Sequence, residues 1–358
     1  CGEPEIGYTQ YLCPECGETK KVPFSCHSRF CISCARLHLE EWVVKIKRMM
    51  FKGVSHRHII LTSPRELWGY FRSDRKLLKV LADAGSDLMR DILRFYRKKK
   101  DIEPGIICVP QTSGRALNFN PHLHLLMTEG GLGKGNVWYQ LSEIDEKLLG
   151  KKWQYFLLTR LKEHLPKTQK IRKLIDALFK EKERFITHAK KEKKRKKDIV
   201  SYLIKYVASP PISLRRILRY DGKNVTYCYS TREGNQRQEE TVSALAFISF
   251  LVQHIPEKGQ KTVRYYGLYA RNKAGKMGTL IAESIRMLNQ SGWEEETETQ
   301  ITEVLSPPLS YRQRMIKYFN KDPTECPKCG AEMIVEKIVG AGGIVIYDLW
   351  DERFQKEV

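Results

Sequence analysis

Hydrophobic residues recur every two positions in some segments and every three or four in others, so we expect the chain to alternate between strands and helices. Strands are expected over residues 8–12, 20–24, 58–62, 105–111, 122–128 and 225–230. Helices are expected over residues 33–50, 76–96, 241–254 and, with an interruption near Pro166, 142–207. This order predicts an α+β fold in which helices cover an antiparallel sheet.

Charge adds the first functional information. The chain has 63 Lys and Arg residues against 42 Asp and Glu residues, a formal net charge of +21. This excess favours a polyanionic partner, because each phosphate that Lys or Arg neutralises releases condensed counterions. No apolar run approaches the roughly eighteen residues that cross a bilayer, so we expect no membrane partner.

Six of the ten cysteines fall within the first 34 residues, and four of these form two Cys-x-x-Cys pairs. The four are Cys13, Cys16, Cys31 and Cys34. We expect them to form one tetrahedral zinc site, which needs four soft ligands. Cys1 and Cys26, with His27 or residues upstream, either form a second zinc site or are buried free thiols. Zinc thiolates are typical of a reducing compartment, so a cytoplasmic protein is expected.

A further pair, Cys326 and Cys329, lies near the C-terminus with no Cys or His after it. It is either half of a metal site completed elsewhere in this chain or in another chain, or a zinc knuckle without metal. The sequence leaves these alternatives open.

Two histidines stand at strand spacing in the segment 117–127. Residues two apart on a strand point to the same face, so His122 and His124 present two imidazoles side by side, while Leu123 and Leu125 point the other way. Such a pair can offer two nitrogen ligands to a divalent ion. A lone His-x-His motif often arises by chance, however, and needs a second signal.

The second signal is a pair of tyrosines on the expected helix. Tyr202 and Tyr206 are four residues apart and share a helix face, and Pro210 ends the helix. Alone, this pattern is more typical of an amphipathic helix with two core tyrosines. A basic run just before it favours contact with a DNA backbone. The basic residues expected to bind DNA are Lys190, Lys191, Lys193, Lys194, Arg195, Lys196, Lys197 and Lys205.

Together the two motifs describe one reaction. A tyrosine hydroxyl is a poor nucleophile near neutral pH, because its pKa is about 10. A His-bound Mg²⁺ or Mn²⁺ can hold the scissile phosphate and align it for in-line attack. The products would be a covalent 5′-phosphotyrosine and a free 3′-OH.

This set of motifs resembles the two-tyrosine rolling-circle transposases of bacterial insertion sequences, which have the HUH nuclease fold. The resemblance covers nearly the whole chain. In addition to the N-terminal cysteines, the matching segments are Gln111–Thr112, Asn118–His124, Tyr202–Tyr206 with Pro210 and Pro211, His254–Gly259, Arg264–Gly267 and Cys326–Gly330.

The resemblance implies that Tyr202 and Tyr206 are the nucleophiles and that His122 and His124 bind the catalytic metal. HUH enzymes use a third protein ligand, and Gln111 on the preceding strand is the first candidate.

The resemblance also implies a fold class and a partner. We expect an N-terminal zinc ribbon over residues 1–50, an HUH catalytic domain over 51–220, and a small C-terminal α+β domain over 221–358. The substrate would be single-stranded DNA at mobile-element ends, together with target DNA. The protein would act at the nucleoid of a bacterial or archaeal cell.

Two other functions are compatible with these motifs. A plasmid or phage replication initiator, or a conjugative relaxase, would use the same chemistry. A zinc-ribbon DNA-binding regulator without catalysis would instead bury Tyr202 and Tyr206 far from the histidines.

Three smaller motifs are interpreted as structural or left open. His56 and His58 are expected in the core or at its rim rather than at a metal. Residues 130–135 are expected to form a hairpin connection. Tyr265 and Tyr266 either stack on unpaired bases or pack in the core.

Overall fold

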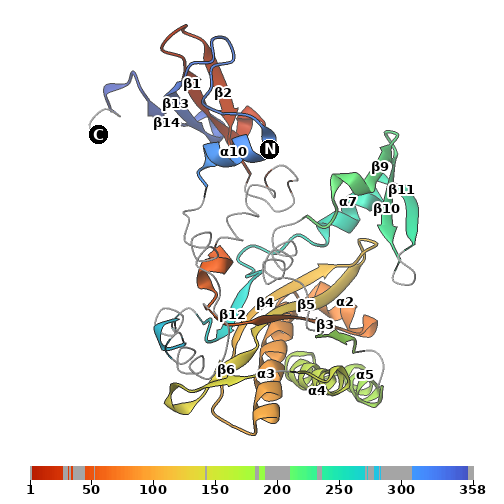
Figure 1. The fold of residues 1–358 in the computed structure, drawn as a ribbon. Coiled ribbons are helices and arrows are strands. Elements are labelled where there is room, and N and C mark those ends of the chain that lie inside the picture. Colours follow the sequence, from red (N-terminus) through yellow and green to blue (C-terminus); the bar gives the residue numbers. More distant parts are fainter. Residues whose placement is uncertain are drawn as a thin grey trace. The chain divides into compact units, whose positions relative to one another are not determined.

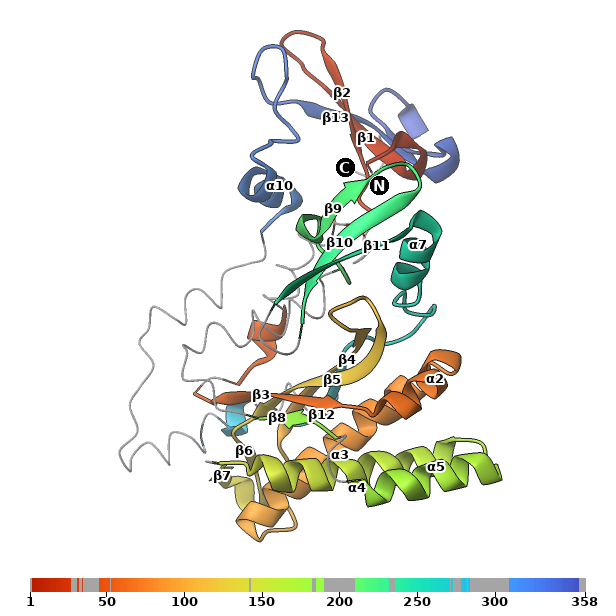
Figure 2. The same cartoon turned by 90° about the vertical axis from the view of Figure 1, so that its right-hand side faces the viewer.

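The computed structural model describes residues 2–26, 31, 34, 45–51, 53–141, 143–181, 185–189, 210–231, 236–270, 272, 278–281, 283 and 309–353. The chain folds into two units, and Figures 1 and 2 show their elements in two views. The first unit contains residues 1–44, 208–210 and 306–358. The second unit contains residues 45–207 and 211–305.

The first unit is built on a four-stranded antiparallel sheet with the strand order β14-β13-β1-β2. Its strands are β1 (Gly7–Leu12), β2 (Thr19–Pro23), β13 (Ile334–Gly340) and β14 (Val345–Asp348). Short 3₁₀ turns (Pro4–Ile6 and Ala341–Gly343) and helix α10 (Tyr311–Phe319) accompany the sheet. Strand β1 lies inside the sheet, because it pairs with β2 on one side and with β13 on the other.

The second unit is built on a five-stranded antiparallel sheet with the strand order β12-β4-β5-β3-β8. Its strands are β3 (His56–Thr62), β4 (Gly105–Ser113), β5 (Phe119–Thr128), β8 (Thr187–His188) and β12 (Arg264–Gly267). Strand β5 is central, with β4 and β3 as its neighbours.

Four helices contribute to the core on one face of this sheet. They are α2 (Arg65–Ser73), α3 (Leu77–Arg97), α4 (Glu146–His164) and α5 (Gln169–Lys180). Figures 1 and 2 both show α3, α4 and α5 on the same side of the sheet. Leu61, Leu123 and Leu125 point into this core and are fully buried, as is Trp153 of α4. Their removal from water is the main stabilising term for the unit.

Two smaller elements complete the second unit. Strands β6 (Gly130–Leu132) and β7 (Trp138–Gln140) form a hairpin around a 3₁₀ turn (Lys134–Asn136). Residues 130–135 were expected to be a hairpin connection, and the first three of them instead form strand β6. The second element is a three-stranded sheet with helix α7. Its parts are a 3₁₀ turn (Leu214–Arg216), β9 (Ile217–Tyr220), β10 (Asn224–Ser230), β11 (Arg237–Ser243) and α7 (Ala244–Val252).

The α+β class with antiparallel sheets and flanking helices is confirmed, but one expected helix is wrong in part. The segment 142–207 contains α4 and α5, and then Thr187 and His188 form strand β8 instead of continuing a helix. Their backbone pairs with Leu61 and Ile60 at the edge of β3. Tertiary pairing here overrides the local helical pattern.

The division into units differs from three consecutive domains with boundaries at residues 50 and 220. Residues 306–358 fold with the N-terminal segment, because β13 pairs with β1. The sheet of β9, β10 and β11 belongs to the second unit, where Leu117 of the β4–β5 connection packs in the same apolar cluster as Tyr227 and Phe247.

Within the part of the chain that the structure describes, no helix combines the length and the apolar character that crossing a membrane requires.

We predict that the buried ion pair between Arg57 and Glu129 is essential to the second unit. Both guanidinium nitrogens that contact Glu129 lie within 3.0 Å of Oε1, and the side chains are only 4% and 3% exposed. Glu129→Gln would leave a buried guanidinium without its counter-charge, at a cost of about 3–5 kcal/mol in the free energy of unfolding. Chemical denaturation followed by tryptophan fluorescence measures this loss.

The matched control is Glu239→Gln. Glu239 pairs with Arg237 at the surface, with side chains 55% and 61% exposed, so a change below about 1 kcal/mol is expected. Equal effects of the two substitutions would contradict a stabilising role for the buried pair.

Candidate metal centres

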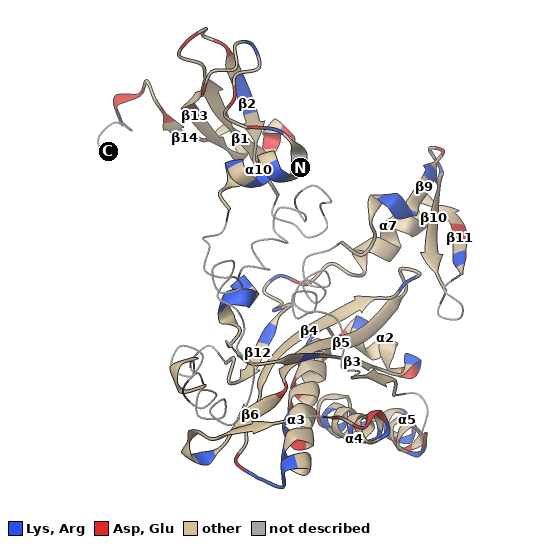
Figure 3. Cartoon of the chain, viewed as in Figure 1, with Lys and Arg blue, Asp and Glu red and all other residues tan. Residues whose placement is uncertain are grey.

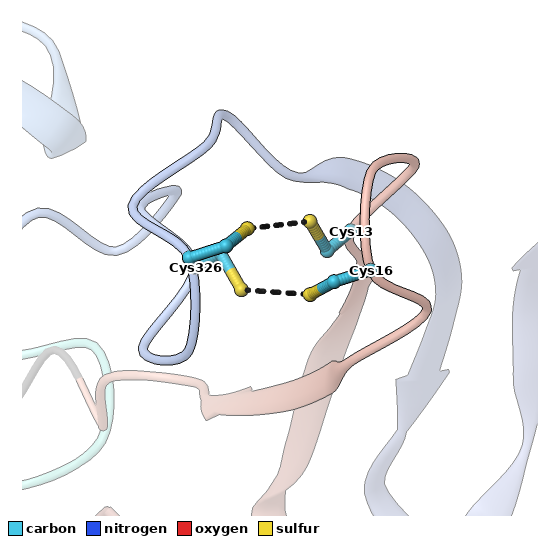
Figure 4. A group of neighbouring side chains, drawn as sticks. Cys13, Cys16 and Cys326 are labelled. Carbon is cyan, nitrogen blue, oxygen red and sulfur yellow. Dashed lines mark hydrogen bonds between the residues drawn. The ribbon is translucent and has the colours of Figure 1, made fainter.

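The first candidate metal centre lies in the first unit and consists of four cysteines, Cys13, Cys16, Cys326 and Cys329. Figure 4 labels the first three of them. The Sγ atoms of Cys13 and Cys329 are 3.5 Å apart, and those of Cys16 and Cys326 are 3.6 Å apart. A tetrahedron with Zn–S bonds of about 2.3 Å has edges of about 3.8 Å. Four thiolates at this spacing fit a structural zinc ion.

The two halves of this centre have the same local structure. Residues 13–17 and 326–330 both read Cys-Pro-x-Cys-Gly. In each half, the glycine amide donates a hydrogen bond of 3.0 Å to the carbonyl of the first cysteine, and the amide of that cysteine donates to a carbonyl five residues later. Gly17 and Gly330 have φ angles of 70° and 75°, a left-handed conformation that favours glycine. The two segments therefore share the local geometry that is typical of zinc knuckles.

The second candidate centre contains Cys26, Cys31 and Cys34. The Sγ atoms of Cys26 and Cys34 are 3.7 Å apart. Burial, and then the neighbouring thiols, raise the pKa of Cys34 to about 11, so bringing these groups together as thiolates requires a cation. Cys1 and His27, the ligands expected to join Cys26, lie outside the described residues.

The expected grouping of four N-terminal cysteines into one site is therefore corrected. Cys13 and Cys16 group with the C-terminal pair, whereas Cys31 and Cys34 group with Cys26. The sequence left open what completes the pair Cys326 and Cys329. In the structure, Cys13 and Cys16 of the same chain lie next to this pair.

A third candidate centre lies in the second unit, on the sheet face opposite the helical core. In the antiparallel register, Gln111 of β4 and Thr62 of β3 flank His122, while Val109 and Ile60 flank His124. Directly opposed residues share a face of the sheet. His122, His124 and the candidate third ligand Gln111 therefore lie on one face.

Hydrogen bonds orient the two histidines. The Nδ1 atom of His122 lies 2.7 Å from the carbonyl oxygen of Asn120, which only accepts, so Nδ1 carries the proton and Nε2 keeps its lone pair. The Nδ1 atom of His124 lies 3.0 Å from Nε2 of His58, and the two rings are stacked with an interplanar angle of 2°. From the sequence, His58 was expected in the core or at its rim. In the structure its imidazole contacts His124.

Burial makes the three imidazoles neutral. It lowers the pKa of His122, lowers the pKa of His58 to about 4, and, together with the neighbouring imidazoles, lowers the pKa of His124 well below its ordinary value. A metal binds the neutral form of imidazole, so these side chains do not need to lose a proton at neutral pH.

The other histidines and tyrosines singled out by the sequence have identifiable contacts. His56 is buried, with Nε2 2.5 Å from the hydroxyl of Tyr269, as expected for a core residue. The hydroxyl of Tyr266 donates to Asp83 at 2.8 Å, and its ring packs against the helical core. Core packing is thus the role of Tyr266. Tyr265 is opposite Ile107, on the same face as the histidines.

The expected nucleophiles Tyr202 and Tyr206 lie outside the described residues, and so do Lys205 and the basic run 190–197. The Lys and Arg residues that the structure describes are distributed over both units rather than confined to one (Figure 3).

Two family models match the chain. Residues 1–63 match the transposase zinc-binding domain, and residues 105–276 match a domain described as putative transposase. The chain is therefore a transposase with a zinc-binding domain. It is similar to insertion-sequence transposases over most of its length.

Two relatives match over most of their length. The transposase for insertion sequence element IS801 of Pseudomonas savastanoi pv. phaseolicola is 29% identical, over 93% of this chain and 80% of the relative. The putative transposase y4qJ of Sinorhizobium fredii (strain NBRC 101917 / NGR234) is 23% identical, over 96% of this chain and 88% of the relative. No solved structure matches the chain.

The low pKa of His58 predicts that the folded protein loses stability in mild acid. In the unfolded chain this imidazole takes up a proton near its ordinary pKa of 6.5, whereas in the folded chain it resists protonation until about pH 4. Between these values the unfolded state binds more protons, so stability decreases as the pH falls. From pH 7 to pH 5 the loss due to this group is about 2 kcal/mol.

Urea denaturation of wild type and His58→Gln at both pH values, without added Mg²⁺ or Mn²⁺, measures this contribution. The variant is expected to lose less stability than wild type over this pH range. Identical losses would show that protonation of His58 is not linked to unfolding.

Proposed function

We propose that this transposase cleaves and rejoins single-stranded DNA at the ends of an insertion sequence through a 5′-phosphotyrosine intermediate. The observation that supports the proposal most is the geometry of β5. His122 and His124 lie side by side on the central strand as neutral imidazoles. They are on the face of the sheet opposite the helical core. No packing requirement of the core explains two imidazoles there.

The side chains on this face fit a divalent metal. Nε2 of His122 is available as a donor, and an amide oxygen from Gln111 on the adjacent strand adds an oxygen ligand. The amide oxygen and the phosphate oxygens of the DNA suit Mn²⁺ or Mg²⁺, and the imidazole nitrogens complete the ligand set. When bound, the metal would neutralise charge on the scissile phosphate and polarise its P–O bond.

The protein side chains would perform the remaining steps. The hydroxyl oxygen of Tyr202 or Tyr206 forms a bond to phosphorus while the bond from phosphorus to the 3′ oxygen breaks. The phenolic proton is lost to solvent, and the departing oxygen takes up a proton to become the free 3′-OH. The phosphotyrosine bond conserves the energy of the cleaved bond, so a second 3′-OH can reverse the step without ATP. With two tyrosines, one cleaves and the other receives the second strand.

His58 would act as a positioning residue. Its Nε2 atom accepts a hydrogen bond from Nδ1–H of His124 in the tautomer that leaves Nε2 of His124 as the ligand atom. The zinc-binding domain and the basic residues 190–197 and Lys205 would hold the DNA ends and the target through the phosphate backbone.

Transposition is favoured over the related reactions of replication initiators and relaxases, because both matched domains and both relatives carry the description transposase. A regulator without catalysis is the alternative that the following experiment distinguishes.

We predict that the protein forms a denaturant-resistant adduct with a labelled single-stranded oligonucleotide from an element end. The adduct should require Mn²⁺ or Mg²⁺ and disappear in the Tyr202→Phe, Tyr206→Phe double variant, because no other nucleophile is proposed. Gel electrophoresis under denaturing conditions detects it, and the single variants rank the two tyrosines.

Tyr220→Phe is the control, since Tyr220 is 63% exposed on β9 and its hydroxyl donates only to a local carbonyl, that of Gly222. Tight DNA binding without any adduct, with either metal, would instead support the regulator.

We also predict that His122→Ala and His124→Ala each weaken Mn²⁺ binding by roughly a hundredfold, and that His58→Gln weakens it by roughly tenfold. Electron paramagnetic resonance of free Mn²⁺ measures binding without reference to cleavage. His164→Ala on α4 is the control, because its exposed imidazole hydrogen-bonds to the carbonyl of Arg160 on the same helix. Unchanged Mn²⁺ affinity in the His122 and His124 variants would show that these histidines do not bind the metal.

A further inference from the structure

We propose that Cys326 and Cys329 complete a structural zinc site with Cys13 and Cys16, and that this site joins the two sequence-distant halves of a single split zinc domain. The matched zinc-binding domain ends at residue 63, so it contains only half of this ligand set. The zinc-binding module would therefore need residues 309–353 as well as the N-terminal segment.

The sheet of the first unit requires both halves. β1 pairs with β13 over six residue pairs, from Gly7 opposite Gly340 to Leu12 opposite Ile334. Without β13, strands β1 and β2 would be an isolated hairpin, which is at best marginally stable in water. The third strand of this sheet therefore comes from more than 300 residues away in the sequence. Cys16, just after β1, and Cys326, just before β13, are already 310 positions apart.

The ligand cysteines also form the small apolar core of this unit. Cys13 and Cys326 are 1% and 3% exposed and cluster with the buried Met333, while Tyr11 packs alongside. Burying thiolates in such a cluster is costly unless a cation neutralises them. Zinc bound by all four sulfurs satisfies that requirement, whereas two cysteines from one knuckle alone would leave half of the coordination sphere open.

Polar contacts position the C-terminal knuckle against the N-terminal hairpin. The ammonium group of Lys20 on β2 donates to the carbonyls of Asp322 and Glu325, at 3.2 and 3.0 Å. Gln10 of β1 donates to Glu336 of β13 at 2.9 Å. These contacts link the N-terminal hairpin to the C-terminal segment, so the four cysteines belong to a specific interface rather than to two loops that approach by chance.

The test is the metal content of the full-length protein. Cys326→Ser with Cys329→Ser is expected to bind one zinc ion fewer per chain than wild type, measured by elemental analysis after dialysis. Cys13→Ser with Cys16→Ser should lose the same single ion, and the four substitutions together should lose no more. Cys228→Ala, at a buried cysteine of β10 outside both clusters, is the matched control and should retain all zinc.

If the serine variants do not fold, a milder substitution with a spectroscopic readout tests the same ligand. Cys329 is exposed, so Cys329→His can supply a nitrogen ligand in place of sulfur. Cobalt(II) substituted into this variant should remain tetrahedral but lose part of the sulfur-to-metal charge-transfer absorption of wild type. An unchanged cobalt spectrum would show that Cys329 is not a ligand.

Two results would overturn the proposal. Full zinc content in the Cys326, Cys329 variant would mean that N-terminal residues alone hold the metal. Recovery of the lost zinc on mixing this variant with the Cys13, Cys16 variant, together with dimer formation in light scattering, would mean that the site joins two chains. Zinc loss that mixing does not reverse supports a site within one chain.

Discussion

Strand β5 has an apolar face of leucines and a polar face with two histidines. The rest of the second unit depends on keeping these two faces apart. Leu123 and Leu125 point into the helical core, so the alternation of a strand forces His122 and His124 to the other face. A shift of one residue in the register with β3 or β4 would bury the imidazoles among leucines and expose the leucines. The same packing that stabilises the sheet therefore fixes the direction and spacing of the paired histidines.

The central place of β5 also determines what can surround the histidines. From His122 to Met127 the strand pairs with a neighbouring strand on both sides, so variation along this face comes from the side chains. Gln111 of β4 lies opposite His122, and His58 of β3 contacts His124. Residues distant in sequence are thus brought together by register alone, and the arrangement tolerates little backbone movement because core packing holds the opposite face.

Features with a local cause could be predicted from the sequence. The periodicity of the apolar residues identified β3, β4, β5 and α3, and the alternation in 122–125 identified which histidines share a face. Features that depend on distant pairing could not. The spacing of Cys31 and Cys34 made them natural partners for Cys13, yet the structure gives that role to Cys326 and Cys329.

A sequence signal for the correct pairing does exist. The shared Cys-Pro-x-Cys-Gly motif of the two knuckles differs from the segment at Cys31. Likewise, His58 could not be placed beside His124 before the register of β3 against β5 was known, because their contact is diagonal across two strands.

The pairing of β1 with β13 has a consequence for the newly synthesised protein. Translation produces β1 and its Cys-Pro-x-Cys-Gly segment well before the strand and segment that complete them, because Cys16 and Cys326 are 310 positions apart in the sequence. At about 5–20 residues per second, the ribosome needs about 15–60 seconds to make the intervening chain. Throughout that interval the N-terminal hairpin has no third strand, while the second unit between the two halves is already emerging. The N-terminal hairpin is thus synthesised long before it can reach its native structure.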